Sequence, residues 1–98
     1  MKTLRAAIIG CGKIAQVHAQ TFVNIEETEL VAVQSRHAAK AEATGAKFGA
    51  RPYTDISEMI QRERVDVAVI CTPHPAHKSA AMEAMQNGAH VLVECPRT

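Results

Sequence analysis

The sequence predicts an α/β fold in which helices wind doubly around a parallel sheet and form three layers with it. Short runs rich in Val and Ile alternate with Ala-rich helical stretches along the 98 residues, and this alternation is typical of βαβ units. The first run, LRAAIIG (residues 4–10), is apolar at almost every position, as in strands that are covered on both faces. Short connections with right-handed crossovers then favour the strand order 3-2-1-4-5.

The first half of the chain is predicted to supply two helices and a second strand after this run. KIAQVHAQTF (residues 13–22) has apolar side chains at helical spacing and would pack back on the sheet. ELVAVQS (residues 29–35) is the second strand. The helix over residues 36–49 consists mostly of Ala and Lys, is weakened by Gly45 and ends at Gly49.

The third strand and the helix after it carry the signals of a sheet edge and of a helix start. ARPYT (residues 50–54) can only be a short strand, and Pro52 places it at an edge because proline donates no ladder hydrogen bond. Asp55, with Glu58 three residues later, resembles a capping box at the start of the next helix. The apolar face of that helix is formed by Ile56, Met59 and Ile60.

Two further strands and one helix complete the alternation. VDVAVICT (residues 65–72) has the strongest strand pattern, and AHVLVE (residues 89–94) is the fifth strand. Between them, residues 74–88 form a helix that stops at Gly88. The side chains of this helix that are predicted to point inward are Ala80, Ala81, Ala84 and Met85.

Size and composition narrow the classes of protein to which the chain can belong. Its length and its 47% hydrophobic content suit one small domain over residues 1–98. Eleven basic and ten acidic residues without a charged block give no reason to expect nucleic acid or an anionic membrane as partner. No apolar stretch approaches the ~20 residues of a membrane span. Three cysteines are too few for a disulfide scaffold, so a cytoplasmic location is expected.

The sequence GCGKIA follows the first strand directly and opens the first helix. Gly10 can make the tight turn, Gly12 lets the backbone approach a pyrophosphate, and Ala15 permits close packing of helix on strand. Unpaired N–H groups at the helix start would face the phosphates. Glycines also close ordinary turns, but the position between strand and helix favours a dinucleotide site.

The end of the second strand distinguishes the two nicotinamide dinucleotides. NAD sites carry an acid there, which accepts hydrogen bonds from the ribose 2′-hydroxyl. QSRHAAK instead supplies Ser35, Arg36 and Lys40, a hydroxyl and two cations that suit a 2′-phosphate, so NADP is favoured over NAD. The alternative is that Ser35 caps the helix and Arg36 is a solvated surface charge. His37 and His90 are expected at the surface or in turns.

The chain resembles the nucleotide-binding domain of the Gfo/Idh/MocA oxidoreductases, the glucose-fructose oxidoreductase and inositol dehydrogenase family, in AAIIGCGKIAQVHAQTF and AVICTPHPAHKSAAMEAMQNGAHVLVECP. The resemblance spans essentially the whole chain. It implies a Rossmann-type domain of an enzyme that passes a hydride between a nicotinamide and a sugar-like or polyol substrate. The residues that the resemblance assigns to the cofactor are Gly10, Gly12, Lys13 and Ile14 for the pyrophosphate, Ser35, Arg36 and Lys40 for the ribose phosphate, Thr72, Pro73, His74 and His77 for the nicotinamide side, and Glu94.

Two departures from the family pattern bear on activity. Cys95 replaces the lysine that the resemblance assigns to substrate binding and proton transfer, and a thiol has neither the fixed charge nor the reach of an ammonium. Family members also continue into a large substrate domain, of which this sequence contains nothing. The chain is therefore expected to bind cofactor without turnover, as a truncated first domain, with a stand-alone regulatory or sensor module as the alternative. If the fifth strand is last in the sheet, copies could associate along its edge.

Metal binding is the minor alternative. Cys11, Cys71, Cys95, His74 and His77 would gather at one rim of the sheet, but the cysteines form no CxxC pair. The simpler interpretation is that Cys71 is a small buried hydrophobe, that Cys11 fills the variable position of the glycine loop, and that the histidines are polar rim residues. No metal site is predicted.

Overall fold

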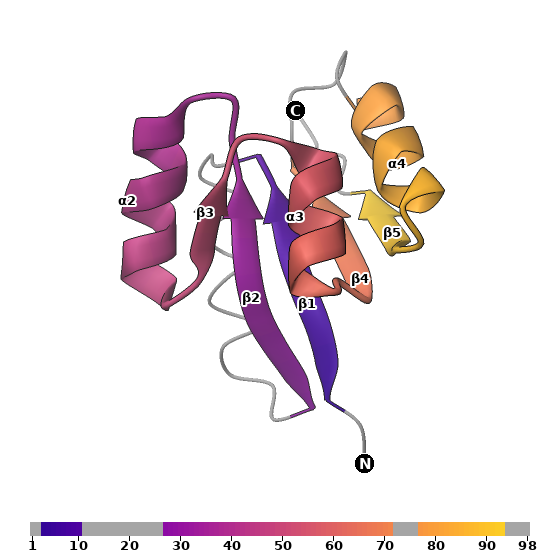
Figure 1. Cartoon of the computed structure of the whole chain (residues 1–98), viewed down its shortest axis with the longest axis horizontal. Coiled ribbons are helices and arrows are strands. Elements are labelled where there is room, and N and C mark those ends of the chain that lie inside the picture. Colours follow the sequence, from indigo (N-terminus) through magenta and orange to yellow (C-terminus); the bar gives the residue numbers. More distant parts are fainter. Residues whose placement is uncertain (1–2, 11–26, 72–76, 94–98) are drawn as a thin grey trace, which may run out of the picture.

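The computed structural model describes residues 3–10, 27–71 and 77–93, which form a five-stranded parallel sheet and its helices (Figure 1). The strand order is β3-β2-β1-β4-β5, as the sequence predicts. The strands are β1 (Leu4–Ile9), β2 (Thr28–Gln34), β3 (Arg51–Tyr53), β4 (Val67–Ile70) and β5 (His90–Val93). The helices are α2 (Ala38–Phe48), α3 (Ile56–Glu63) and α4 (His77–Gln86). The helix predicted over residues 13–22 lies outside the described residues.

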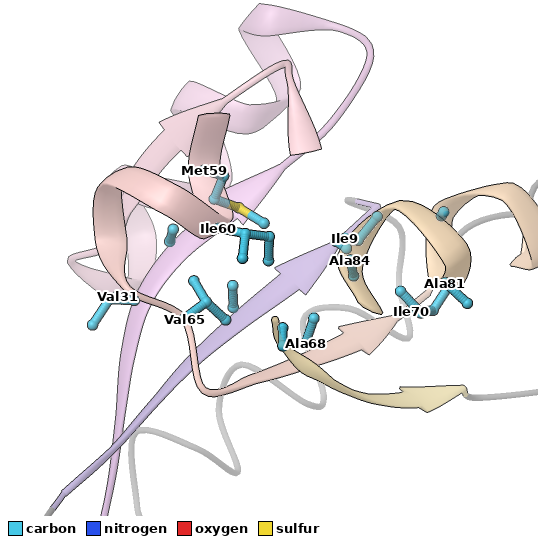
Figure 2. Close-up of a cluster of buried hydrophobic side chains, with 13 residues drawn as sticks. Ile9, Val31, Met59, Ile60, Val65, Ala68, Ile70, Ala81 and Ala84 are labelled. Carbon is cyan, nitrogen blue, oxygen red and sulfur yellow. The ribbon is translucent and has the colours of Figure 1, made fainter. Parts of the chain in front are cut away.

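The two faces of the sheet are buried under different helices, which gives the predicted three layers. Ile9 belongs to a core cluster with Met59 of α3 and Ala84 of α4, and Figure 2 shows these side chains pointing toward one another between helices and sheet. Ile8 points to the opposite face, because successive strand residues alternate, and belongs to a second cluster against which Phe48 of α2 packs. Each fully buried aliphatic side chain of this size contributes about 1.5–3 kcal/mol through burial.

The third strand lies at the edge of the sheet, where Pro52 was predicted to place it. β3 pairs with β2, and both Arg51 and Pro52 are exposed to solvent. Proline has no N–H, so on an edge strand it neither breaks a ladder of hydrogen bonds nor offers a donor to another chain. Among the described residues, no helix is both long and apolar enough to cross a bilayer.

The capping box predicted at the start of α3 is wrong. Asp55 is the N-cap residue, but its side chain makes no capping hydrogen bond. The N–H of Ser57 instead donates to the Glu83 carboxylate of α4, at 3.0 Å. A carboxylate from a neighbouring helix therefore satisfies this helix end and complements its dipole, so the local pair Asp55 and Glu58 is not needed for it. The predicted apolar face is confirmed, with Met59 and Ile60 buried.

The inward face predicted for α4 is confirmed for three of its four residues. Ala80, Ala81 and Ala84 are buried, whereas Met85 is 55% exposed. One residue is about 100° of helix rotation, so Met85 lies beside the face whose centre is Ala84. Small alanines allow α4 to lie close to the sheet. The turn after α4 contains Gly88, and α2 ends at Gly49, as predicted.

Candidate functional site

Backbone hydrogen bonds join the carboxyl ends of the inner strands β2, β1 and β4. This end of the sheet is called the carboxyl edge below. The N–H of Gly10 donates to the carbonyl of Gln34 at 2.7 Å, and the N–H of Cys71 donates to the carbonyl of Ile9 at 2.8 Å. The connections after β1 and β4 lead to opposite neighbours, β2 and β5, so the winding of the sheet reverses between these two strands. Open α/β sheets bind ligands outside the carboxyl ends of the strands at such a reversal.

Gly10 makes the turn that leaves β1 at this edge. Its φ of 97° lies in the region that residues with a side chain rarely adopt, so the turn requires glycine, as the sequence motif predicts. The other residues predicted to line the pyrophosphate, Gly12, Lys13 and Ile14, lie outside the described residues. The structure therefore positions the first glycine of the motif at the end of β1.

Ser35 follows β2 at the same edge and is only 7% exposed. Its N–H donates to the carbonyl of Tyr53 at 3.1 Å, and its Oγ accepts a hydrogen bond from the N–H of His37 at 3.2 Å. The N-cap residue of α2 is His37, which makes no side-chain capping bond, so Ser35 is not the cap of this helix. Ser35 instead fixes the loop between β2 and α2 from both sides.

Arg36 and Lys40 flank the N-terminus of α2, and both are exposed. The first turn of α2 contains no acidic residue. An acid is normally favourable at a helix N-terminus, because the dipole and the unpaired N–H groups there attract negative charge. Two cations and no acid therefore leave this helix end suited to an external anion.

Gln34, which sequence reasoning passed over, also shapes this end of the sheet. Gln34, the last residue of β2, is buried, and its side-chain amide donates to the carbonyl of Thr54 at 2.9 Å. This bond ties the end of β2 to the loop after β3. His37 was predicted only as a surface or turn residue, and it is exposed.

The predicted nicotinamide side falls mostly outside the described residues. Thr72, Pro73, His74, Glu94 and Cys95 are not described. The backbone of His77 begins α4.

Three of the five residues in the metal hypothesis, Cys11, His74 and Cys95, also lie outside the described residues. Within the described ranges, no three His, Cys, Asp or Glu side chains lie close enough together to hold a metal ion. Cys71 is half-buried against the second core cluster, so it is more exposed than the buried residue predicted from its strand.

Comparison with known proteins identifies the family. A 4-carboxy-2-hydroxymuconate-6-semialdehyde dehydrogenase of a Sphingobium species is 38% identical over 94 residues, which cover 95% of this chain and 30% of that protein. A scyllo-inositol 2-dehydrogenase (NADP(+)) of Bacillus subtilis is 36% identical, over 95% of this chain and 29% of its own length. The crystal structure of GenD2 from gentamicin A biosynthesis, in complex with NAD, matches 95% of this chain and 27% of its own at 28% identity, with a TM-score of 0.89.

The chain thus spans about 30% of the length of the relatives that it matches. Residues 4–98 match the family model described as an oxidoreductase family with an NAD-binding Rossmann fold. The sheet order, the glycine turn after β1 and these matches agree with one another. The chain belongs to the Gfo/Idh/MocA family of oxidoreductases and matches its dinucleotide-binding domain.

Proposed function

We propose that this chain is the NADP-preferring cofactor domain of an oxidoreductase that acts on a sugar-like or polyol substrate, and that it binds the cofactor without turnover by itself. The observation that carries the preference is the N-terminus of α2, which has Arg36 and Lys40 beside it and no acid in its first turn. A ribose 2′-phosphate would meet two cations at a helix N-terminus, whereas a ribose 2′-hydroxyl would lack the carboxylate that usually accepts its hydrogen bonds.

Ser35 would contribute a donor to the same phosphate. Its Oγ already accepts the N–H of His37, and its hydroxyl proton remains available to donate. No described acceptor takes that proton. Because the backbone of Ser35 is also held by Tyr53, the hydroxyl would be positioned before the cofactor arrives, and less ordering entropy would be lost on binding.

The rest of the cofactor site stays a proposal from family resemblance. Gly10 would begin the pyrophosphate loop, which would continue through Gly12, Lys13 and Ile14. The proposed nicotinamide contacts are Thr72, Pro73, His74, His77 and Glu94. A bound nicotinamide dinucleotide would supply the hydride chemistry, and these residues would hold and orient it. With Cys95 at the position of the family's lysine, the chain has no ammonium there to assist proton transfer.

The substrate class is proposed from the names of two relatives. The inositol dehydrogenase relative acts on a polyol by its name, while the semialdehyde dehydrogenase relative acts on a carboxylated aldehyde. We propose the sugar-like or polyol class because the inositol dehydrogenase relative and the motifs shared with the glucose-fructose oxidoreductase family both point to it. We propose a cytoplasmic location, because three cysteines are too few for a disulfide scaffold.

Calorimetric titration of the chain with NADPH and with NADH tests the preference, and Arg36→Asp tests its cause. We expect NADPH to bind more tightly to the wild-type chain. Arg36→Asp should lower the ratio of the two affinities by about tenfold or more, because a charge-assisted contact is lost and a repelling charge is added.

Arg64→Asp is the matched control. Arg64 is exposed at the C-terminal end of α3, and Asp tolerates its positive φ. This variant changes the net charge equally and should keep the wild-type ratio. Equal or tighter binding of NADH by the wild-type chain, or no binding of either dinucleotide, would refute the proposal. An unchanged ratio in Arg36→Asp would show that Arg36 does not contact the phosphate.

A further inference from the structure

Gln34 places a buried amide at the carboxyl edge, in a strand whose other buried side chains are aliphatic. It is the last residue of β2 and is only 5% exposed, and Val33 before it is fully buried. An amide is unfavourable in such a place unless its polar groups are hydrogen-bonded, whereas an aliphatic side chain has no such requirement. The bond that this amide makes therefore indicates what the residue does.

Two hydrogen bonds join the end of β2 to the end of β3. The N–H of Ser35 donates to the carbonyl of Tyr53 at 3.1 Å, and Nε2 of Gln34 donates to the carbonyl of Thr54 at 2.9 Å. The last paired residues of the two strands are Gln34 and Tyr53, and Thr54 lies in the loop between β3 and α3. The buried amide thus continues the connection between the strands for one residue beyond the sheet.

The main chain of Gln34 is bonded to the glycine turn. Its carbonyl accepts the N–H of Gly10 at 2.7 Å. One residue therefore holds the turn after β1 through its main chain and the loop after β3 through its side chain. Ser35 follows directly, at the position where NAD sites carry a carboxylate for the ribose. The segment proposed to meet the adenosine ribose is thus held from both neighbouring strands.

We propose that Gln34 is a positioning residue for the dinucleotide and acts through Ser35. The inference rests on the proposed cofactor site and adds a residue that is not among those assigned to the cofactor above. Because Gln34 is buried, it acts without touching the cofactor. Its hydrogen bond to Thr54 orders the end of β2 before binding, so the Ser35 hydroxyl loses less freedom when the ribose arrives. The effect applies to both nicotinamide dinucleotides, since both carry this ribose.

Gln34→Met tests the proposal, because methionine keeps the length of the side chain and removes the donor. Calorimetric titration of the 98-residue chain should show that NADPH and NADH each bind about threefold to tenfold more weakly to this variant, the loss expected for one hydrogen bond. Unchanged affinities would overturn the proposal. If Gln34→Met is not folded under these conditions, Gln34→Asn, whose amide is too short to reach Thr54, is titrated in its place with the same expected loss.

A double-mutant cycle with Ser35→Ala distinguishes positioning from a general loss of stability. In the wild-type background, Ser35→Ala should lower the affinity for NADPH about fivefold. In the Gln34→Met background it should lower the affinity less than twofold, because the hydroxyl is no longer held in place. Equal factors in both backgrounds overturn the role of Gln34. No effect of Ser35→Ala in the wild type, or no binding of either dinucleotide, overturns the proposed cofactor contact and this inference together.

Asn87→Leu is the matched control. Asn87 also donates a side-chain amide to a backbone carbonyl, that of Glu83 at 2.7 Å, but it lies just before β5, at the amino end of the strands. This variant should lower the midpoint of urea denaturation and keep the wild-type affinity for both dinucleotides. A loss of affinity as large as that in Gln34→Met would assign the effect of Gln34 to stability alone and overturn its positioning role.

Discussion

The buried carboxylate of Glu63 shows how single residues tie the edge of this sheet to its centre. It accepts a hydrogen bond from the Tyr53 hydroxyl at 2.6 Å and approaches Nη2 of Arg5 at 3.4 Å and Nε of Arg51 at 3.7 Å. The Nε of Arg5 also donates to the backbone carbonyl of Glu63, at 2.6 Å. Burying an unpaired carboxylate would be costly, and these donors from β1 and β3 offset that cost at the end of α3.

Burial raises the pKa of Tyr53 above its ordinary value near 10, and the hydrogen bond to Glu63 raises it further. The neutral phenol thus stabilises the folded chain below pH 10, and this contribution is lost as the pH rises through the folded pKa. Tyr53→Phe should lower the free energy of unfolding by about 1–2 kcal/mol at pH 8. The difference between variant and wild type should shrink above pH 10. Urea denaturation at both pH values measures it, and a constant difference would contradict the assignment.

At the scale of elements, α3 and α4 form a unit through polar side chains. Ser57 donates from both its N–H and its hydroxyl to Glu83, at 3.0 and 2.6 Å. Asn87 donates to Ser57 Oγ at 3.1 Å, and Gln61 donates to Asn87 at 2.6 Å. Glu83 lies 26 residues after Ser57, so no local sequence rule could have predicted this cap. The helix that leads from β4 to β5 is thereby held against the helix that leads into β4.

Gly45 was predicted to weaken α2, and the structure gives it a packing role as well. A Cβ at this position would lie 2.5 Å from the carbonyl oxygen of Ala50. That oxygen cannot move aside easily, because it belongs to the backbone just before β3. Gly45→Ala should therefore lower the free energy of unfolding by about 1–3 kcal/mol, although alanine is the better helix former by about 1 kcal/mol.

Ala46→Gly, at an exposed position of the same helix, gives the effect of helix propensity alone and should cost about 1 kcal/mol. Chemical denaturation of both variants separates the two effects. If Gly45→Ala were more stable than the wild-type chain, the close approach of α2 to the backbone of Ala50 would not be a constraint.

At the scale of the whole molecule, the topology was predictable because it depends on local patterns and general rules. Alternating strands and helices with short right-handed crossovers leave few arrangements, and Pro52 marks one edge. The cap of α3 was mispredicted because it comes from a neighbouring helix, and Met85 was mispredicted because it lies beside the inward face of α4. The site was predictable where backbone conformation requires a residue type, as at Gly10. Gln34 was missed because its hydrogen bond to the carbonyl of Thr54 joins segments that are 20 residues apart in the sequence.

The second edge of the sheet is the exposed strand β5, and it supports the proposal that copies of the chain associate. Among the described strands, β5 pairs with β4 alone, and Leu92 within it is 52% exposed. Unpaired N–H and C=O groups beside an exposed apolar side chain form a template for another strand. Sedimentation velocity should then show a sedimentation coefficient that rises with protein concentration.

Leu92→Lys should suppress this association, because a charge on an edge strand opposes pairing with a second copy. Leu4→Lys is the matched control, since Leu4 is 49% exposed but belongs to β1, which is paired on both sides. This variant should associate as the wild-type chain does. A wild-type chain that stays monomeric at high concentration would exclude association through β5. Equal effects of the two lysine substitutions would assign any association to general surface hydrophobicity instead of the strand edge.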